Sequence, residues 1–228
     1  MANSPSLLAL TNGRIVLPDR VVAGKALVID HGRIGELVNP GALGSDVQRL
    51  DVGGRIVAPG LIDIHVHGAV GHTFNEPTAE AFGAITAACA RRGVTSLLAT
   101  IATAAIPDLV ASLRMTRAWM AEARPGGAVL GAHLEGPYFS MGQRGAQDPK
   151  YIRTPDDGTV DALLEHHDVM RIMTFAPELP GALALAERAA ALGIVPAAGH
   201  SDAFDTDVEA AVARGLRHAI HLWSGQST

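Results

Sequence analysis

The sequence predicts an α/β fold in which helices cover a parallel sheet and a small β-rich portion comes first. Three observations support this prediction. From residue 59 onward apolar strand patterns alternate with helical patterns, three of the predicted helices end in a similar glycine-containing way, and polar side chains recur at the ends of predicted strands. With 228 residues, of which 48% are hydrophobic, the chain can bury a full core as one large domain or as one domain with a small appendage.

The N-terminal portion, residues 1–57, contains short apolar segments that are broken by turn-forming residues. The turn signals are Asn12-Gly13, Pro18-Asp19, Asp30-His31-Gly32 and Gly53-Gly54. This spacing predicts a small β-rich unit with hairpins.

Residues 58–228 are predicted to alternate between strands and helices. Strand patterns cover residues 61–67, 95–100, 129–135, 171–175, 195–200 and 217–222. Helical patterns cover residues 77–92, 108–123, 181–192 and 205–214. Gly93, Gly193 and Gly215 follow three of these helices, where glycine favours the left-handed conformation that ends a helix. The order suits either an open doubly wound sheet or most of a (β/α)8 barrel, and the first βα turn has no G-x-G-x-x-G phosphate loop.

Composition limits the classes of partner. The net charge is −5 and no long run of like charges occurs, so we expect no nucleic-acid partner and no membrane surface, and a small molecule instead. Cys89 is the only cysteine, which excludes a disulfide within the chain and favours a reducing compartment. The start, MANSPSLLAL, lacks the features of a leader peptide, and no run approaches the roughly 18 apolar residues of a membrane span. We therefore expect a cytoplasmic protein.

Histidines and one glutamate recur at the ends of the predicted strands. Residues two apart on a strand point to the same side, so His65 and His67 share one face of the first barrel strand, whereas its aliphatic face, with Ile62 and Ile64, suits the helix layer. The carboxyl ends of parallel strands meet at one rim of a barrel, where such side chains converge. Imidazole and carboxylate are suitable zinc ligands, so the set predicts a site for one or two divalent metal ions, with zinc as the first choice. The candidate ligands are His65, His67, Glu135, His200 and His221.

Other histidines have less specific expectations. His133 shares a strand face with Glu135, and it either orients a metal ligand or is a hydrogen-bonded core residue. His166 and His167 are expected at the solvated end of a helix. The loop 139–158 is rich in turn formers and follows Glu135, so it is either a lid over the site or an ordinary surface loop.

Five motifs occur in a fixed order through nearly the whole chain. They are APGLIDIHVHG, HLEGPYFS followed by a Gly-rich loop, TFAPE at 174–178, GHSDA at 199–203 and HLWSGQ at 221–226. Together they resemble the amidohydrolase superfamily, most closely its deacetylases of N-acetylated amino sugars. The resemblance implies a metal-dependent (β/α)8 barrel of the TIM type, incomplete here with about six βα units, and a small N-terminal β-sandwich portion.

The same resemblance implies roles for the candidate residues. Glu135, His200 and His221 would ligate the main metal ion, and His65 and His67 would form a second metal site. The implied reaction is removal of the acetyl group from an N-acetylated amino sugar such as N-acetylglucosamine 6-phosphate, by a homodimer.

The sequence departs from the family pattern at the substrate-binding positions and at the catalytic residue. Gln147 stands where the family has a substrate-contacting histidine, and Ser224 and Gly225 stand where it has residues that touch the sugar phosphate. These three are the candidate substrate-binding residues. The catalytic aspartate of the family is expected beyond Thr228, so no catalytic residue is assigned. Two alternatives therefore stay open: hydrolysis of another amide, a cyclic amide or an amino-purine, and a catalytically incomplete metal-binding chain.

Overall fold

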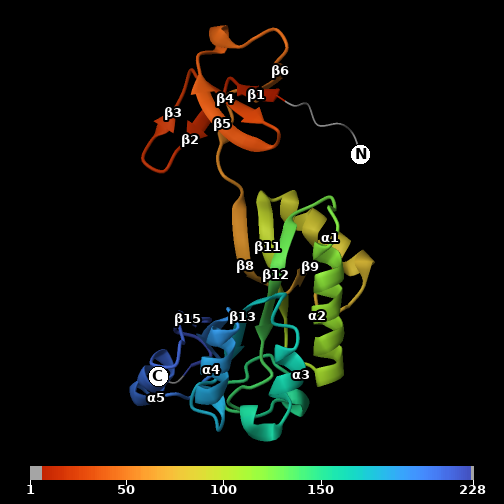
Figure 1. The fold of residues 1–228 in the computed structure, drawn as a ribbon, viewed down its shortest axis with the longest axis vertical. Coiled ribbons are helices and arrows are strands. Elements are labelled where there is room, and N and C mark those ends of the chain that lie inside the picture. The colour runs from red at the N-terminus through yellow and green to blue at the C-terminus, as the bar shows by residue number, and fades with distance from the viewer. Residues whose placement is uncertain (1–6, 227–228) are drawn as a thin grey trace. The chain divides into compact units, whose positions relative to one another are not determined.

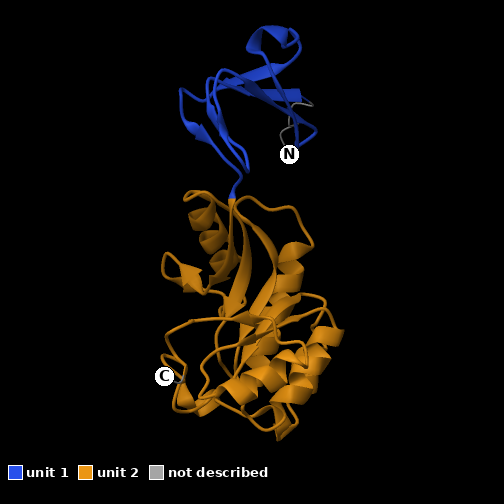
Figure 2. Ribbon diagram, turned by 90° about the vertical axis from the view of Figure 1, so that its left-hand side faces the viewer, with its two compact units in different colours: residues 1–60 blue, residues 61–228 orange. Residues whose placement is uncertain are grey.

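The structure, a computed structural model, describes residues 7–226. These residues divide into two compact units at the junction between Gly60 and Leu61, coloured separately in Figure 2. None of the described helices is long and apolar enough to cross a membrane.

The N-terminal unit contains two small sheets. A four-stranded sheet has the order β5-β4-β1-β6 and consists of β1 (Leu7–Thr11), β4 (Ala26–Asp30), β5 (Arg33–Val38) and β6 (Gln48–Asp51). A three-stranded sheet has the order β3-β2-β7 and consists of β2 (Arg14–Val16), β3 (Val21–Val22) and β7 (Ile56–Val57). The predicted hairpin at Asp30-His31-Gly32 is confirmed. His31 and Gly32 have φ angles of 46° and 77°, as the tight turn between β4 and β5 requires.

The second unit is built on a six-stranded parallel sheet with the order β15-β14-β13-β12-β11-β8 (Figure 1). Its strands are β8 (Leu61–Val66), β11 (Val94–Ile101), β12 (Ala128–Glu135), β13 (Met170–Phe175), β14 (Val195–Ala198) and β15 (His218–Ala219). Each of these strands pairs with the next one along the chain. A doubly wound sheet would reverse this order at a switch point, so the described strands favour the barrel among the two predicted alternatives.

The helices lie in the connections between these strands. They are α1 (Ala79–Ala90), α2 (Ile106–Met120), α3 (Val160–Leu164), α4 (Ala182–Ala191) and α5 (Asp205–Val212). Gly93, Gly193 and Gly215 have φ angles of 86°, 78° and 107°, which confirms the predicted left-handed helix ends. The short helix α3 and a hairpin of β9 (Gly68–Ala69) and β10 (His72–Thr73) were not predicted, because each is shorter than the window in which periodicity is detectable.

The last two strands are shorter than predicted. The sequence pattern extended them through His200 and His221, but β14 ends at Ala198 and β15 at Ala219. His200 and His221 have φ angles of 53° and 51°, a left-handed conformation that cannot continue a β ladder. Both histidines therefore lie just beyond the strand ends.

Two further expectations were wrong in part. The aliphatic face of β8 was expected to pack against the helix layer, yet Ile62 and Ile64 remain 64% and 43% exposed, because no described helix packs closely on this edge strand. His166 was expected to be solvated, but it is buried and its Nδ1 accepts a hydrogen bond from Arg117 at 3.0 Å. Arg117 is 49 residues away in sequence, so no local pattern could reveal this contact.

Candidate metal centre

The site is centred on the carboxylate of Glu135, the last residue of β12. Its side chain is 1% exposed, and four imidazole groups from three other loops or strands surround its two oxygens. The Oε1 atom lies 2.9 Å from Nε2 of both His200 and His221. The Oε2 atom lies 2.7 Å from Nε2 of His67 and 3.6 Å from Nε2 of His65. The structure thus brings together all five candidate ligands.

His65 and His67 reach the site from β8 and from the residue after it. Their alternation places both rings on the same side of the strand, with ring centroids 5.1 Å apart and edge to face. The hairpin β9–β10 then holds the backbone of His67, because the His67 carbonyl accepts hydrogen bonds from Thr73 Oγ1 at 3.1 Å and from Phe74 N at 2.9 Å. Local contacts therefore fix this pair.

His200 and His221 follow β14 and β15. Both occupy the left-handed conformation, which is uncommon for non-glycine residues and costs of order 1–3 kcal/mol where it occurs. The ring of His200 packs against Phe139, with centroids 4.4 Å apart, and its Nδ1 donates to the carbonyl of Gln143 at 2.9 Å. The left-handed backbone at both residues, and for His200 also these two contacts, direct the Nε2 atoms at Glu135.

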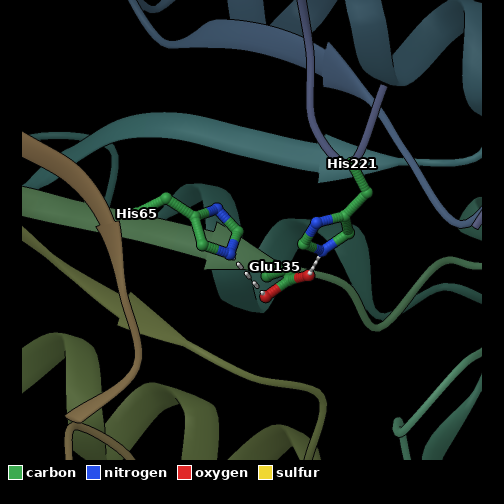
Figure 3. Close-up of side chains that lie close together, drawn as sticks. All are labelled: His65, Glu135 and His221. Atoms are coloured by element: carbon green, nitrogen blue, oxygen red, sulfur yellow. Dashed lines mark hydrogen bonds and ion pairs between the residues drawn. The ribbon is translucent and has the colours of Figure 1, made fainter. Parts of the chain in front are cut away.

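The donor set fits a divalent cation. His200 faces an acceptor at each ring nitrogen, so a neutral imidazole can donate to only one of them, whereas an imidazolium donates to both. The buried Oε2 of Glu135 makes no hydrogen bond, although His67 Nε2 is close to it. A metal ion bound by the Glu135 carboxylate and by His200 Nε2 would satisfy both groups in place of a shared proton. Figure 3 shows the subset in which one potential ligand atom from each of His65, Glu135 and His221 lies within 4.8 Å of the others.

The Glu135 carboxylate shifts the protonation equilibria of the cluster. Burial opposes charge on His200, but its hydrogen bonds with Glu135 and with the Gln143 carbonyl outweigh burial and raise its pKa above the ordinary value. Burial disfavours the ionised Glu135 carboxylate, but the surrounding imidazoles of His200, His67 and His221 outweigh burial and hold its pKa far below the ordinary value. Burial lowers the pKa of His65. The neighbouring His67 and His221 lower it further, whereas the Glu135 carboxylate raises it and only partly offsets them. The cluster therefore offers an ionised carboxylate beside at least one neutral imidazole.

His133 is fully buried and contacts the site through β8. Its Nε2 lies 2.8 Å from Thr174 Oγ1, and its Nδ1 lies 3.1 Å from the carbonyl oxygen of Ile64, the residue before His65. Burial lowers the pKa of His133 to about 4, so the ring is neutral at ordinary pH. It is a hydrogen-bonded core residue whose ring also lies edge to face against His65, with centroids 4.9 Å apart.

The candidate substrate residues lie on two loops near His200. Gln147 accepts a hydrogen bond at its Oε1 from Thr103 N at 3.1 Å. Ser224 donates its backbone N–H to the carbonyl of His221 at 2.6 Å. A side chain added at Gly225 would begin 3.8 Å from His200 Nδ1. Sequence reasoning missed Thr103, which could have been found because it follows the strand 94–101 at the same sheet edge as the other candidates.

Comparison with known proteins identifies the family. The Amidohydrolase family profile matches residues 56–226. The chain belongs to the amidohydrolase family. The solved structure of N-acetylglucosamine-6-phosphate deacetylase from Pasteurella multocida is similar to it with a TM-score of 0.87 and 26% identity, over 93% of this chain and 56% of that one. The six-stranded sheet and this similarity fit the predicted incomplete barrel.

Two curated relatives are also named as deacetylases of amino sugar phosphates. A Danio rerio protein named N-acetylglucosamine-6-phosphate deacetylase is 33% identical over 204 residues, 84% of this amidohydrolase chain and 50% of that protein. An Escherichia coli O157:H7 protein named N-acetylgalactosamine-6-phosphate deacetylase is 30% identical over 174 residues, 76% of this chain and 46% of that protein. The chain therefore spans about half the length of these relatives.

Proposed function

We propose that this amidohydrolase is a metal-dependent deacetylase that hydrolyses the amide bond of an N-acetylated amino sugar phosphate, with N-acetylglucosamine 6-phosphate as the first choice of substrate. One observation carries the proposal: four imidazole nitrogens surround a single buried carboxylate at the carboxyl ends of the strands. The names of the relatives from Danio rerio and Pasteurella multocida supply the substrate.

The proposed metal ligands divide into two groups. Glu135, His200 and His221 would hold the main ion, and His65 and His67 would hold a second. Zinc is the proposed ion because imidazole and carboxylate groups suit it and no described cysteine lies among them. When bound, such an ion activates a carbonyl group and a water molecule for hydrolysis.

Gln147 is the proposed hydrogen-bond donor to the acetyl oxygen. Because its Oε1 already accepts from Thr103, its Nε2 group is the part of the amide that remains to donate. This donor is neutral, so its contribution would not depend on a protonation equilibrium as that of a histidine does. Ser224 and Gly225 are proposed to contact the sugar phosphate.

The metal content of the purified chain is the first test. We expect one or two zinc ions per chain by elemental analysis after reconstitution. The variant His200→Ala should lose the main ion, whereas His31→Ala, which removes an exposed histidine of the N-terminal unit, should bind as the wild type does. Absence of zinc from the reconstituted wild-type chain would contradict the proposal.

Acetate release from a panel of amides is the second test. The panel contains N-acetylglucosamine 6-phosphate, N-acetylgalactosamine 6-phosphate and a cyclic amide, and the second sugar is included because a relative is named for it. We expect turnover of an amino sugar phosphate and none of the cyclic amide. Cyclic-amide hydrolysis in place of acetate release would instead support the alternative substrate class.

Three coarser expectations belong to the same proposal. A cytoplasmic location is supported by the free cysteine Cys89 and is tested by cell fractionation. A homodimer is tested by the mass of the protein in solution. A β-sandwich formed by the two N-terminal sheets is tested by an experimental structure of that unit.

A further inference from the structure

A loop that leads from β12 toward Gln147 is tied to an aspartate from a different strand end. In this segment, residues 140–147, Ser140 Oγ donates to Asp202 Oδ2, and Gln143 Nε2 donates to Asp202 Oδ1 at 2.7 Å. Gly142 lies between them, and a β-carbon there would lie only 3.0 Å from Asp202 Oδ2. The loop therefore passes closely over the Asp202 carboxylate.

The same loop contacts His200, one of the proposed metal ligands. The carbonyl of Gln143 accepts from His200 Nδ1 at 2.9 Å, and the amide of Ser140 donates to the His200 carbonyl at 2.9 Å. A carbonyl can only accept, so it keeps a proton on Nδ1 and leaves Nε2 to face Glu135 with a lone pair when a metal ion is present. The position of this carbonyl thus sets the ring orientation of His200 and which of its nitrogens faces Glu135.

Asp202 is itself held from a third loop. Glu178, the last residue of the TFAPE motif that follows β13, accepts from Asp202 N at Oε1 and from Ser201 Oγ at Oε2, each at 2.7 Å. The loops that follow β12, β13 and β14 are therefore connected to one another by two carboxylates. Glu178 thus holds the Ser201–Asp202 segment in place, whereas the proposed reaction assigns no role to Glu178.

We propose that Asp202 is a positioning residue that, by binding Ser140 and Gln143, keeps the Gln143 carbonyl on His200 and so orients His200 toward the metal. This inference rests on the proposed metal site. Both oxygens of Asp202 are occupied by donors from the 140–147 loop, so it acts through Gln143 and is not a further metal ligand. The 140–147 part of the longer loop is then a fixed wall of the site and not a lid.

The variant Asp202→Ala tests this role with two readouts that need no substrate. Residues 140–147 include one trypsin site, at Arg144. Releasing the loop should make cleavage after Arg144 in the metal-free 228-residue chain at least about tenfold faster, because proteases cut segments that open locally. Zinc affinity, measured by competition with a chelator, should fall by about 10–100-fold, as when other groups that orient metal-bound histidines are removed.

Three further variants separate positioning from folding and charge. Asp202→Asn should restore most of both readouts, because the Asn oxygen can accept from Gln143 and its amide can donate to the Ser140 hydroxyl. Gln143→Ala keeps the backbone carbonyl but loses the side-chain bond to Asp202, so it should show a smaller change in the same direction. Asp205→Ala removes a nearby exposed aspartate whose carboxylate bonds only the adjacent Thr206 among the described contacts, and it should match the wild type.

The outcomes are distinct. Wild-type zinc affinity in a folded Asp202→Ala chain would overturn the inference, whether or not cleavage after Arg144 changes, because the loop would then not serve His200. A failure of Asp202→Asn to rescue would also overturn it, since charge and not geometry would be required. If the chain binds zinc and both readouts change as expected but no acetate is released from any amino sugar, the proposed reaction fails and the positioning role stands.

Discussion

Strands β12 and β8 both present groups to the site, but they are held in different ways. β12 lies in the interior of the sheet between β11 and β13, and six of its eight residues are buried. β8 pairs only with β11 among the described strands, and none of its six residues is buried. Packing therefore fixes Glu135 at the end of β12, whereas burial contributes little to the placement of His65.

Side-chain hydrogen bonds, two of them with residues of other strands, take the place of burial at β8. Thr100 Oγ1 accepts from the amide of Val66 at 2.9 Å, and His133 contacts the carbonyl of Ile64. Asp63 Oδ1 also accepts from the amide of His65 at 3.0 Å. The comparison teaches that one half of the proposed site depends on the core and the other half on a few specific polar contacts.

The largest effect is expected from Glu135→Gln. The amide keeps the shape but removes the only carboxylate among four imidazoles, so zinc binding to both proposed sites should be lost. His65→Ala, on the edge strand, should remove one ion and leave the other, as measured by zinc stoichiometry. Equal loss in the two variants would show that the central and edge ligands form a single site.

Core and edge should also differ in folding stability. Leu134 in β12 is fully buried, so Leu134→Ala should lower the free energy of unfolding by about 2–5 kcal/mol. Ile62→Ala in β8, whose side chain is 64% exposed, should change it by about 0.5 kcal/mol or less. Urea unfolding of both variants checks the difference, and similar costs would mean that Ile62 is covered in solution.

Folding stability should depend on pH through Tyr138, a buried residue three positions after the end of β12. Burial raises the pKa of Tyr138 to about 12, against the opposing effect of its hydrogen bond with Thr159. The unfolded chain releases this proton near pH 10 and the folded chain near pH 12, so stability should fall as pH rises through that window. The loss should reach roughly 2 kcal/mol.

Two variants isolate this contribution. Tyr138→Phe should remove the extra slope of unfolding free energy against pH in that window, although it also gives up the hydrogen bond with Thr159. Because the chain has only two tyrosines, the absorbance titration of Tyr151→Phe reports on Tyr138 alone. An ordinary tyrosine pKa in that titration would contradict the burial argument.

The smallest of the expected effects concerns the attachment of the edge strand. Thr100→Val keeps the shape but removes the acceptor for the amide of Val66, which should cost about 1–2 kcal/mol of unfolding free energy. It should also weaken zinc binding at the proposed His65 and His67 site more than at the main site. Thr95→Val, an exposed position on the same strand, is the control and should be nearly neutral.

The sequence by itself determined the features that depend on neighbouring residues. Strand and helix alternation, the glycine ends of helices at Gly93, Gly193 and Gly215, and the common face of His65 and His67 all follow from backbone geometry over a few residues. The hairpin at His31 and Gly32 has the same origin. These features were predictable because the physical interactions that cause them are local.

Only the tertiary structure decided what depends on distant pairs. The left-handed backbone at His200 and His221 shortened the predicted strands, and the burial of His166 by Arg117 overturned its expected solvation. The contact of the Gln143 carbonyl with His200 spans 57 residues, and a backbone carbonyl has no signature in sequence. Sequence periodicity shows which face a side chain occupies, whereas its partners are set by the packing of strands and loops that lie far apart in the chain.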